Sequence, residues 1–179
     1  MKASKIIKMD ISAHPSWKSI QGHFQDIRTD GTVYLIGGAA RQFLFGGEIN
    51  DFDYTIIGGS YYSVNKLPQK NKRAEVENGA CSHRGLQEYF KSRDFTINQV
   101  AVNSKGILYA TKSCLMAREK RVLFSVKTST TLRELVRALR FSKEYNLRLS
   151  NNLERELTKA GNLIQQEPVF VRYRRQGLL

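Results

Sequence analysis

Two apolar stretches near the start of the chain are separated by a short segment rich in glycine and alanine. Residues 32–36 and 52–57 carry mainly β-branched, aromatic and other apolar side chains, which favours strands. Residues 39–44 between them have a helical pattern, and Gly46 and Gly47 follow, as glycines do where helices end. The pattern predicts a strand, a helix and a second strand as the core of a mixed α/β (α+β) fold.

Weaker patterns predict further elements on both sides of this core. We expect strands at residues 4–9 and 73–77 and an edge strand at 107–109. Helices are expected from Pro15 to residue 25 or 27, at 86–90 and at 114–120. The apolar run at 95–102 is either helical or strand-like. Gly58, Gly59 and the polar tract 65–72, which contains Pro68, predict a loop.

The last third of the chain has a helical period. Between residues 132 and 145, apolar side chains recur at positions 132, 135, 136, 139 and 141 with arginines between them, the pattern of an amphipathic helix. Ser150 and the two asparagines after it are suited to starting another helix over residues 153–165. We therefore expect a head domain over residues 1–112 and a helical neck with a basic C-terminal tail over 113–179.

Asp51 and Asp53 are the strongest candidates for chemistry. Alternate side chains of a strand share a face, so the two carboxylates project together while Phe52 points the other way. Paired carboxylates suit Mg²⁺, which takes a few carboxylate oxygens together with substrate phosphates, and a two-metal site serves phosphoryl or nucleotidyl transfer. Taken alone, such a pair more often marks a solvated strand end or a loop.

Gly37 and Gly38 precede the helix of the predicted core. Because glycine has no Cβ, a phosphate can approach the backbone N–H groups closely, and the positive end of the helix would face that anion. Arg41 would add charge-assisted hydrogen bonds. A pair of glycines after a strand is usually only a turn, so the indication rests on the combination with the two aspartates.

These residues resemble a known family. Residues 35–41 (LIGGAAR) and 50–53 (NDFD) are similar to the signature of the class II tRNA nucleotidyltransferases (CCA-adding enzymes) and bacterial poly(A) polymerases. Residues 93–98 (RDFTIN) and 135–141 (LVRALRF) resemble the second motif of that family and the start of its neck helices, in the same order. The resemblance implies a DNA polymerase beta-like nucleotidyltransferase head with a short mixed sheet, followed by a small helical neck.

The resemblance also implies roles for further residues. Nucleotide-binding roles carry over to Arg93, which would contact phosphate, to Asp94 and Asn98, which would contact the ribose or organise its pocket, and to Arg137 and Arg140, which would present the base or the phosphates. Asp94 has an alternative role as the cap of a helix carrying Thr96 and Asn98, and the two neck arginines have one as surface or salt-bridge partners. A third carboxylate would be Glu75 or Glu77, with a salt-bridged surface strand as the alternative.

The chain departs from the family at three places. The base-selecting motif of the family has an acidic pair followed three residues later by an arginine, whereas the matching positions here are Thr130, Thr131 and Glu134. Gln42 replaces the aspartate that ordinarily follows the motif arginine. Most of the C-terminal body that measures the tRNA acceptor arm in full-length relatives is also missing, so templated CCA synthesis by this chain alone is doubtful, and a protein partner is an expected substitute.

Composition agrees with a polyanionic partner. The 29 Lys and Arg residues outnumber the 16 Asp and Glu residues, which gives a formal net charge of +13 and favours RNA, although anionic membrane surfaces attract the same charge. Arg172, Arg174 and Arg175, interleaved with Phe170 and Tyr173, are candidates for binding single-stranded RNA. They are equally suited to a tail that packs on a partner.

Other features narrow the class of protein. The sequence has no apolar run long enough to span a bilayer and no secretory signal, so we expect a cytoplasmic protein without a membrane partner. The two cysteines and three histidines lack the spacing of a disulfide framework or a zinc site.

The sequence as a whole predicts an enzyme that transfers a nucleoside monophosphate from a nucleoside triphosphate, ATP and/or CTP, to an RNA 3′ end such as that of tRNA. Two Mg²⁺ ions would be held by Asp51 and Asp53. The alternatives are an RNA- or nucleotide-binding module with reduced or no catalysis, and a transferase that acts on a hydroxyl of a protein or small molecule.

Overall fold

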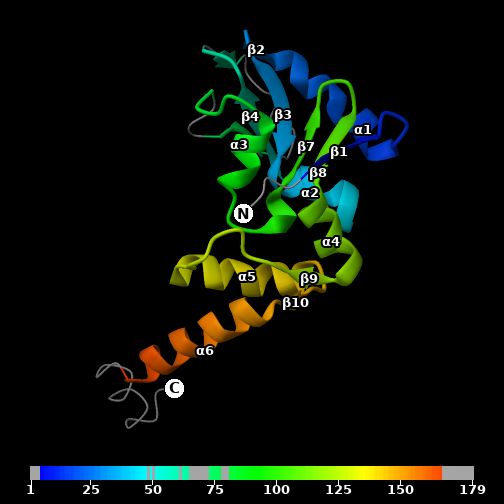
Figure 1. Ribbon diagram of the computed structural model, residues 1–179. Coiled ribbons are helices and arrows are strands. Elements are labelled where there is room, and N and C mark those ends of the chain that lie inside the picture. The colour runs from blue at the N-terminus through cyan, green and yellow to red at the C-terminus, as the bar shows by residue number, and fades with distance from the viewer. Residues whose placement is uncertain are drawn as a thin grey trace.

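The computed structural model describes residues 5–47, 49, 51–60, 62–64, 73–77 and 81–166. Within these residues, the central feature is a mixed sheet with the strand order β1-β8-β7-β3-β4-β6 (Figure 1). Its strands are β1 (Ile6–Asp10), β3 (Thr32–Ile36), β4 (Asp51–Ile57), β6 (Arg73–Val76), β7 (Val100–Asn103) and β8 (Ile107–Thr111). Neighbouring strands are antiparallel, except that β4 and β6 run parallel.

Helices cover both faces of this sheet. One face packs against α1 (Pro15–Ile20), a 3₁₀ helix (Gln21–Asp26) and α2 (Gly37–Phe45), through a core that includes Trp17, Phe24 and Tyr54. The other face packs against α3 (Leu86–Lys91), whose Tyr89 and Phe90 are buried. The predicted strand, helix and strand core is therefore confirmed as β3, α2 and β4.

A second core lies among the C-terminal helices, below the sheet in Figure 1. It joins α4 (Lys112–Lys120), α5 (Leu132–Glu144) and α6 (Asn151–Gln166) to a 3₁₀ turn (Thr96–Asn98). The α5 helix buries Leu135, Ala138 and Phe141, while its other apolar residues Leu132, Val136 and Leu139 are exposed. The predicted boundary at residues 112 and 113 falls where α4 begins, and it stays a prediction.

The structure corrects some expectations about elements. The predicted edge strand at 107–109 is instead internal as β8, because β1 pairs along its whole length, from Ile6 opposite Thr111 to Asp10 opposite Ile107. The apolar run at 95–102 divides into the 3₁₀ turn and β7. Two small sheets were not predicted: β2 (Ile27–Thr29) with β5 (Tyr62–Val64), and β9 (Val122–Leu123) with β10 (Arg148–Leu149).

Further expectations concern membranes, cysteines and a loop. No helix among the described residues has both the length and the apolar character needed to cross a bilayer. Cys81 and Cys114 are free thiols. The tract 65–72, predicted as a loop, lies outside the described residues.

Candidate nucleotide-binding site

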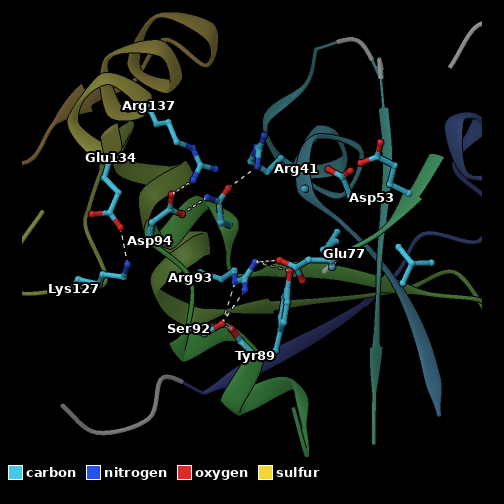
Figure 2. A pocket seen from close by; sticks show the side chains of 15 residues that line it. Arg41, Asp53, Glu77, Tyr89, Ser92, Arg93, Asp94, Lys127, Glu134 and Arg137 are labelled. Carbon is cyan, nitrogen blue, oxygen red and sulfur yellow. Dashed lines mark hydrogen bonds and ion pairs between the residues drawn. The ribbon is translucent and has the colours of Figure 1, made fainter. Parts of the chain in front are cut away.

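A cavity of about 620 Å³ lies beside β4 and β6 and reaches the start of α5 (Figure 2). It brings together seven residues that the sequence singled out from four separate segments. These are Gly37, Arg41, Asp53, Arg93, Asp94, Asn98 and Arg137. The cavity is also lined by both candidates for the third carboxylate, Glu75 and Glu77. Three further lining residues, Ser92, Tyr89 and Lys127, were not indicated by any sequence pattern.

The aspartate pair lies at the start of β4 as its alternation predicts. Phe52 is buried, while Asp51 is exposed and Asp53 is partly exposed and lines the cavity. On the neighbouring parallel strand, Glu75 stands directly opposite Asp53, so the two carboxylates share a face of the sheet. Burial raises the pKa of Asp53, and the negative charges of Asp51 and Glu75 raise it further. The strand register therefore favours Glu75 over Glu77 as the third carboxylate.

This carboxylate group suits a hard cation. Within the described residues, none of the ion pairs includes Asp53, and the carboxylates of Asp51 and Glu75 raise its pKa more than the Arg41 cation lowers it. No group of three or more His, Cys, Asp or Glu side chains in the same residues is arranged to hold a metal ion by itself. A Mg²⁺ ion at Asp51 and Asp53 would thus complete its oxygen ligands from phosphates and water, as this ion commonly does.

Gly37 lies against Asp53 at the first turn of α2. Its φ is +66°, a conformation that other residues adopt only with strain. A Cβ at this position would stand 3.3 Å from the Cβ and Cγ of Asp53 and would collide with Oδ2. Position 37 therefore requires glycine for two reasons, and the free backbone N–H groups of the α2 N-terminus are brought beside the carboxylate.

Arg41 is held in place by residues from other elements. Although only 7% of the residue is exposed, it lines the cavity. Its Nη1 donates to Asn98 Oδ1 at 2.5 Å, and its Nε donates to the Tyr145 hydroxyl at 3.2 Å. Its guanidinium carbon also lies 4.7 Å from the centre of the Phe141 ring. The guanidinium of Arg41 is thus held between α2 and α5. Its contact with phosphate stays a prediction.

Asp94 connects Arg41 to α5. Its Oδ1 accepts a hydrogen bond from Asn98 Nδ2 at 2.6 Å, and its Oδ2 forms an ion pair with Arg137 Nη1 at 2.6 Å. Asn98 in turn accepts from Arg41, so four polar side chains form one continuous network (Figure 2). Asp94 does not cap the 3₁₀ turn from Thr96 to Asn98, which has no side-chain cap. The network supports the predicted role of Asp94 and Asn98 in organising the pocket.

Arg93 forms a second ion pair in the pocket. Its Nη1 donates to Glu77 Oε1 at 2.7 Å, and its guanidinium carbon lies 4.2 Å from the centre of the Tyr89 ring. Glu77 is therefore neutralised by Arg93. The choice of Glu75 as the third carboxylate rests on the strand register, which places it opposite Asp53.

Lys127 and Glu134 form the wall of the cavity farthest from Asp53 in the view of Figure 2. Lys127 Nζ lies 2.6 Å from Glu134 Oε1, while Glu134 Oε2 accepts from the backbone N–H and the hydroxyl of Thr131, each at 2.9 Å. Thr131 and Glu134 form a capping box at the start of α5. The hydrogen bond from Lys127, with those from Thr131, lowers the pKa of Glu134 to about 2.

Replacing Glu134 with alanine is expected to lower the free energy of unfolding by about 1 kcal/mol at pH 7, because the capping box is lost. The pKa of Glu134 is lowered on folding from 4.5 to about 2, so its stabilisation is complete above pH 4.5 and disappears as the pH falls toward 2. Urea unfolding of both proteins across this range measures the difference. Glu156→Ala, which breaks the exposed pair with Lys159 on α6, is the control. A difference that stayed constant from pH 7 to pH 2 would contradict the assignment.

Some predicted site residues lie elsewhere. Gly38 does not line the cavity, and a Cβ there would meet only Arg41 Nη2, at 3.8 Å. Arg140 is exposed, with its guanidinium carbon 5.3 Å from the centre of the Phe141 ring, and it also lies outside the cavity wall. Arg172, Arg174 and Arg175 lie outside the described residues.

The chain is similar in sequence to CCA-adding enzymes. A CCA-adding enzyme of Geobacillus stearothermophilus is 25% identical over 185 residues, which cover 84% of this chain and 46% of that enzyme. A multifunctional CCA protein of Shewanella denitrificans is 32% identical over 105 residues, covering 43% of this chain and 25% of the relative. The chain thus spans between a quarter and about half of the length of these relatives. No protein-family model matches the chain.

Solved structures show the same fold. A CCA-adding enzyme in complex with CTP has a TM-score of 0.64 and 20% sequence identity, covering 87% of this chain and 45% of that one. A Thermotoga maritima CCA-adding enzyme complexed with tRNA has the same TM-score and identity, covering 86% of this chain and 45% of that one. The fold is that of a nucleotidyltransferase with a head of the DNA polymerase beta type. The chain is similar to CCA-adding enzymes in sequence and in fold, which confirms the resemblance of its motifs.

Proposed function

We propose that this protein is a metal-dependent nucleotidyltransferase that transfers a nucleoside monophosphate from a nucleoside triphosphate to the 3′ hydroxyl of an RNA and releases pyrophosphate. The observation that carries the proposal is the placement of Asp53. Its carboxylate stands beside Asp51 and Glu75, against Gly37 at the start of α2, and on the wall of a cavity lined with cations. Carboxylates for a metal thus meet backbone donors for a phosphate in one place.

The proposed substrates come from the relatives and from charge. Similar CCA-adding enzymes have been solved with ATP, with CTP and with tRNA, which supports a triphosphate and an RNA 3′ end such as that of tRNA as substrates. The formal net charge of +13 would steer a polyanion toward the protein. A protein partner that supplies further RNA contacts belongs to the same proposal, since the chain matches only part of each relative.

The residues of the chain would act mainly by positioning and by charge. Asp51 and Asp53 would hold the Mg²⁺ ions, with Glu75 nearby, and bound Mg²⁺ would supply charge stabilisation at the attacking and leaving oxygens. The N-terminus of α2 would orient the triphosphate. Asp94 and Asn98 would set the ribose, since their polar groups lie between Arg41 and Arg137. Such a site needs no covalent intermediate on the protein.

The direct test is incorporation of each radiolabelled nucleoside triphosphate into a pool of small RNAs with Mg²⁺, with pyrophosphate release measured in parallel. We expect label in RNA and equimolar pyrophosphate, and both should stop when EDTA removes the metal. RNA and nucleotide binding without pyrophosphate release would favour the binding module. Pyrophosphate release with label in a protein or small molecule would favour a different hydroxyl acceptor.

A further inference from the structure

The wall of the cavity opposite the carboxylates offers one acceptor and one donor to a ligand. Glu134 Oε2 already accepts two hydrogen bonds from Thr131, so only Oε1 is directed elsewhere, and it also meets Lys127 Nζ at 2.6 Å. The capping box fixes Glu134 at the first turn of α5, and its side chain is only 13% exposed. Glu134 therefore presents a single, rigid acceptor oxygen.

Lys127 is the matching donor, and it is less constrained. Its side chain is 50% exposed, and an ammonium on a flexible stem has no preferred plane, unlike the fork of a guanidinium. Arg137, which also lines the cavity, forms its ion pair with Asp94 at 2.6 Å. Among the described residues of this wall, the Lys127–Glu134 pair therefore offers a ligand one fixed acceptor and one mobile donor.

The position of this pair relative to the phosphate site decides which part of a nucleotide it meets. Asp53 lies at one side of the cavity, Lys127 and Glu134 lie at the other, and Asp94 and Arg93 lie between them (Figure 2). Gly37 lies against Asp53. A nucleotide with its triphosphate at Gly37 and its ribose at Asp94 directs its base toward the pair. This step rests on the proposed function.

The hydrogen-bonding edges of the four bases have one feature in common, a donor next to an acceptor. Adenine has N6–H beside N1, cytosine N4–H beside N3, guanine N1–H beside O6, and uracil N3–H beside O4. Each edge thus has a donor for Glu134 Oε1 next to an acceptor for Lys127 Nζ, but the order of the two is reversed between adenine or cytosine and guanine or uracil. The flexible stem of Lys127 lets its ammonium reach the acceptor on either side of the donor. A site discriminates between bases by hydrogen bonds when the wrong base leaves a buried polar group of the site unpaired. One mobile donor next to one acceptor can pair with any of the four bases, so no group is left unpaired.

We propose that the Lys127–Glu134 pair holds the base of the incoming nucleotide and makes this a base-tolerant site, which takes all four nucleoside triphosphates. This differs from a rigid template that selects one or two bases. The pair contributes affinity through two charge-assisted hydrogen bonds to each base, one to Glu134 and one from Lys127, and the phosphates and ribose supply the rest.

Calorimetric titration with the non-hydrolysable α,β-methylene analogues of ATP, CTP, GTP and UTP, in the presence of Mg²⁺, tests the proposal. We expect the four dissociation constants to lie within about threefold of one another, and ribose 5′-triphosphate, which has no base, to bind about tenfold more weakly. A preference above about tenfold for one or two bases overturns base tolerance. Equal binding of ribose triphosphate overturns the contact with the base.

Two variants assign the effect to the pair. Lys127→Met should weaken the binding of all four analogues by the same factor. Glu134→Gln should do the same, and its glutamine can still complete the capping box at the start of α5. Lys159→Met, which removes the lysine of the exposed pair with Glu156 on α6, is the matched control and should change none of them. An effect on one nucleotide alone overturns the proposal.

The same titration separates this inference from the proposed function. Similar binding of all four analogues, without transfer of any natural nucleotide to RNA, would refute the transferase and support the base-tolerant pocket. Transfer of one nucleotide only, with matching selective binding, would support the transferase and refute base tolerance.

Discussion

Replacement of Asp53 by asparagine is expected to lower the rate of nucleotidyl transfer by about 10³-fold or more, because the metal would lose its central carboxylate. Asparagine keeps the shape of the side chain but not its charge. In the folded protein, burial and the charges of Asp51 and Glu75 raise the pKa of Asp53. The ionised carboxylate therefore opposes folding, and the metal-free variant should be at least as stable as the wild type.

The measurement is pyrophosphate release with saturating Mg²⁺, together with thermal unfolding in EDTA. Asp10→Asn is a suitable control, because Asp10 is an exposed carboxylate on β1 whose hydrogen bond comes from the backbone of Ser12. That variant should retain full activity. Wild-type rates in both Asp53→Asn and Asp51→Asn would refute the metal site, whereas loss of the folded state in Asp53→Asn would show that this carboxylate has a structural role.

Replacement of Gly37 by alanine is the second change with a large expected effect. The positive φ of position 37 would cost about 1–2 kcal/mol of stability in any residue with a Cβ. The new methyl group would also displace the Asp53 carboxylate, with which it collides. A misplacement of this kind can reduce a rate by about 10²-fold, so we expect a loss of activity beyond what destabilisation explains.

Gly58→Ala separates strain from collision. Gly58 has a φ of +72°, similar to that of Gly37, but a Cβ there meets nothing within 4 Å. Both variants should be destabilised to a similar degree in urea unfolding, and only Gly37→Ala should lose transfer activity below its melting temperature. Equal activities in the two variants would mean that Gly37 is required for its backbone conformation alone.

Local sequence patterns were sufficient to predict the core of the fold and the strand that carries Asp51 and Asp53. Alternation in residues 51–57 placed Phe52 inward and the two aspartates on the other face, and the structure agrees. The same rule found β6 and thereby Glu75, although the choice between Glu75 and Glu77 required the register with β4. Strand pattern and glycine position are local properties of the sequence, so they can be read without the fold.

The remaining features depend on contacts between distant residues. The pairing of β1 with β8 joins segments about a hundred residues apart, and nothing in residues 107–109 indicates that the chain start covers that edge. Lys127 lies in a segment without regular structure, and only its contact with Glu134 identifies it. The strands β9 and β10 have two residues each, too few for any period to be recognised.

The contacts that hold Arg41 limit how this protein can be engineered. Its guanidinium comes from α2, but the hydroxyl and the ring that hold it come from Tyr145 and Phe141, about a hundred residues later. The sheet and α5 are therefore not interchangeable modules. A chimera that combined this sheet with helices lacking the Tyr145 hydroxyl and the Phe141 ring would leave a buried cation without its partners, so the two parts would have to be transplanted together.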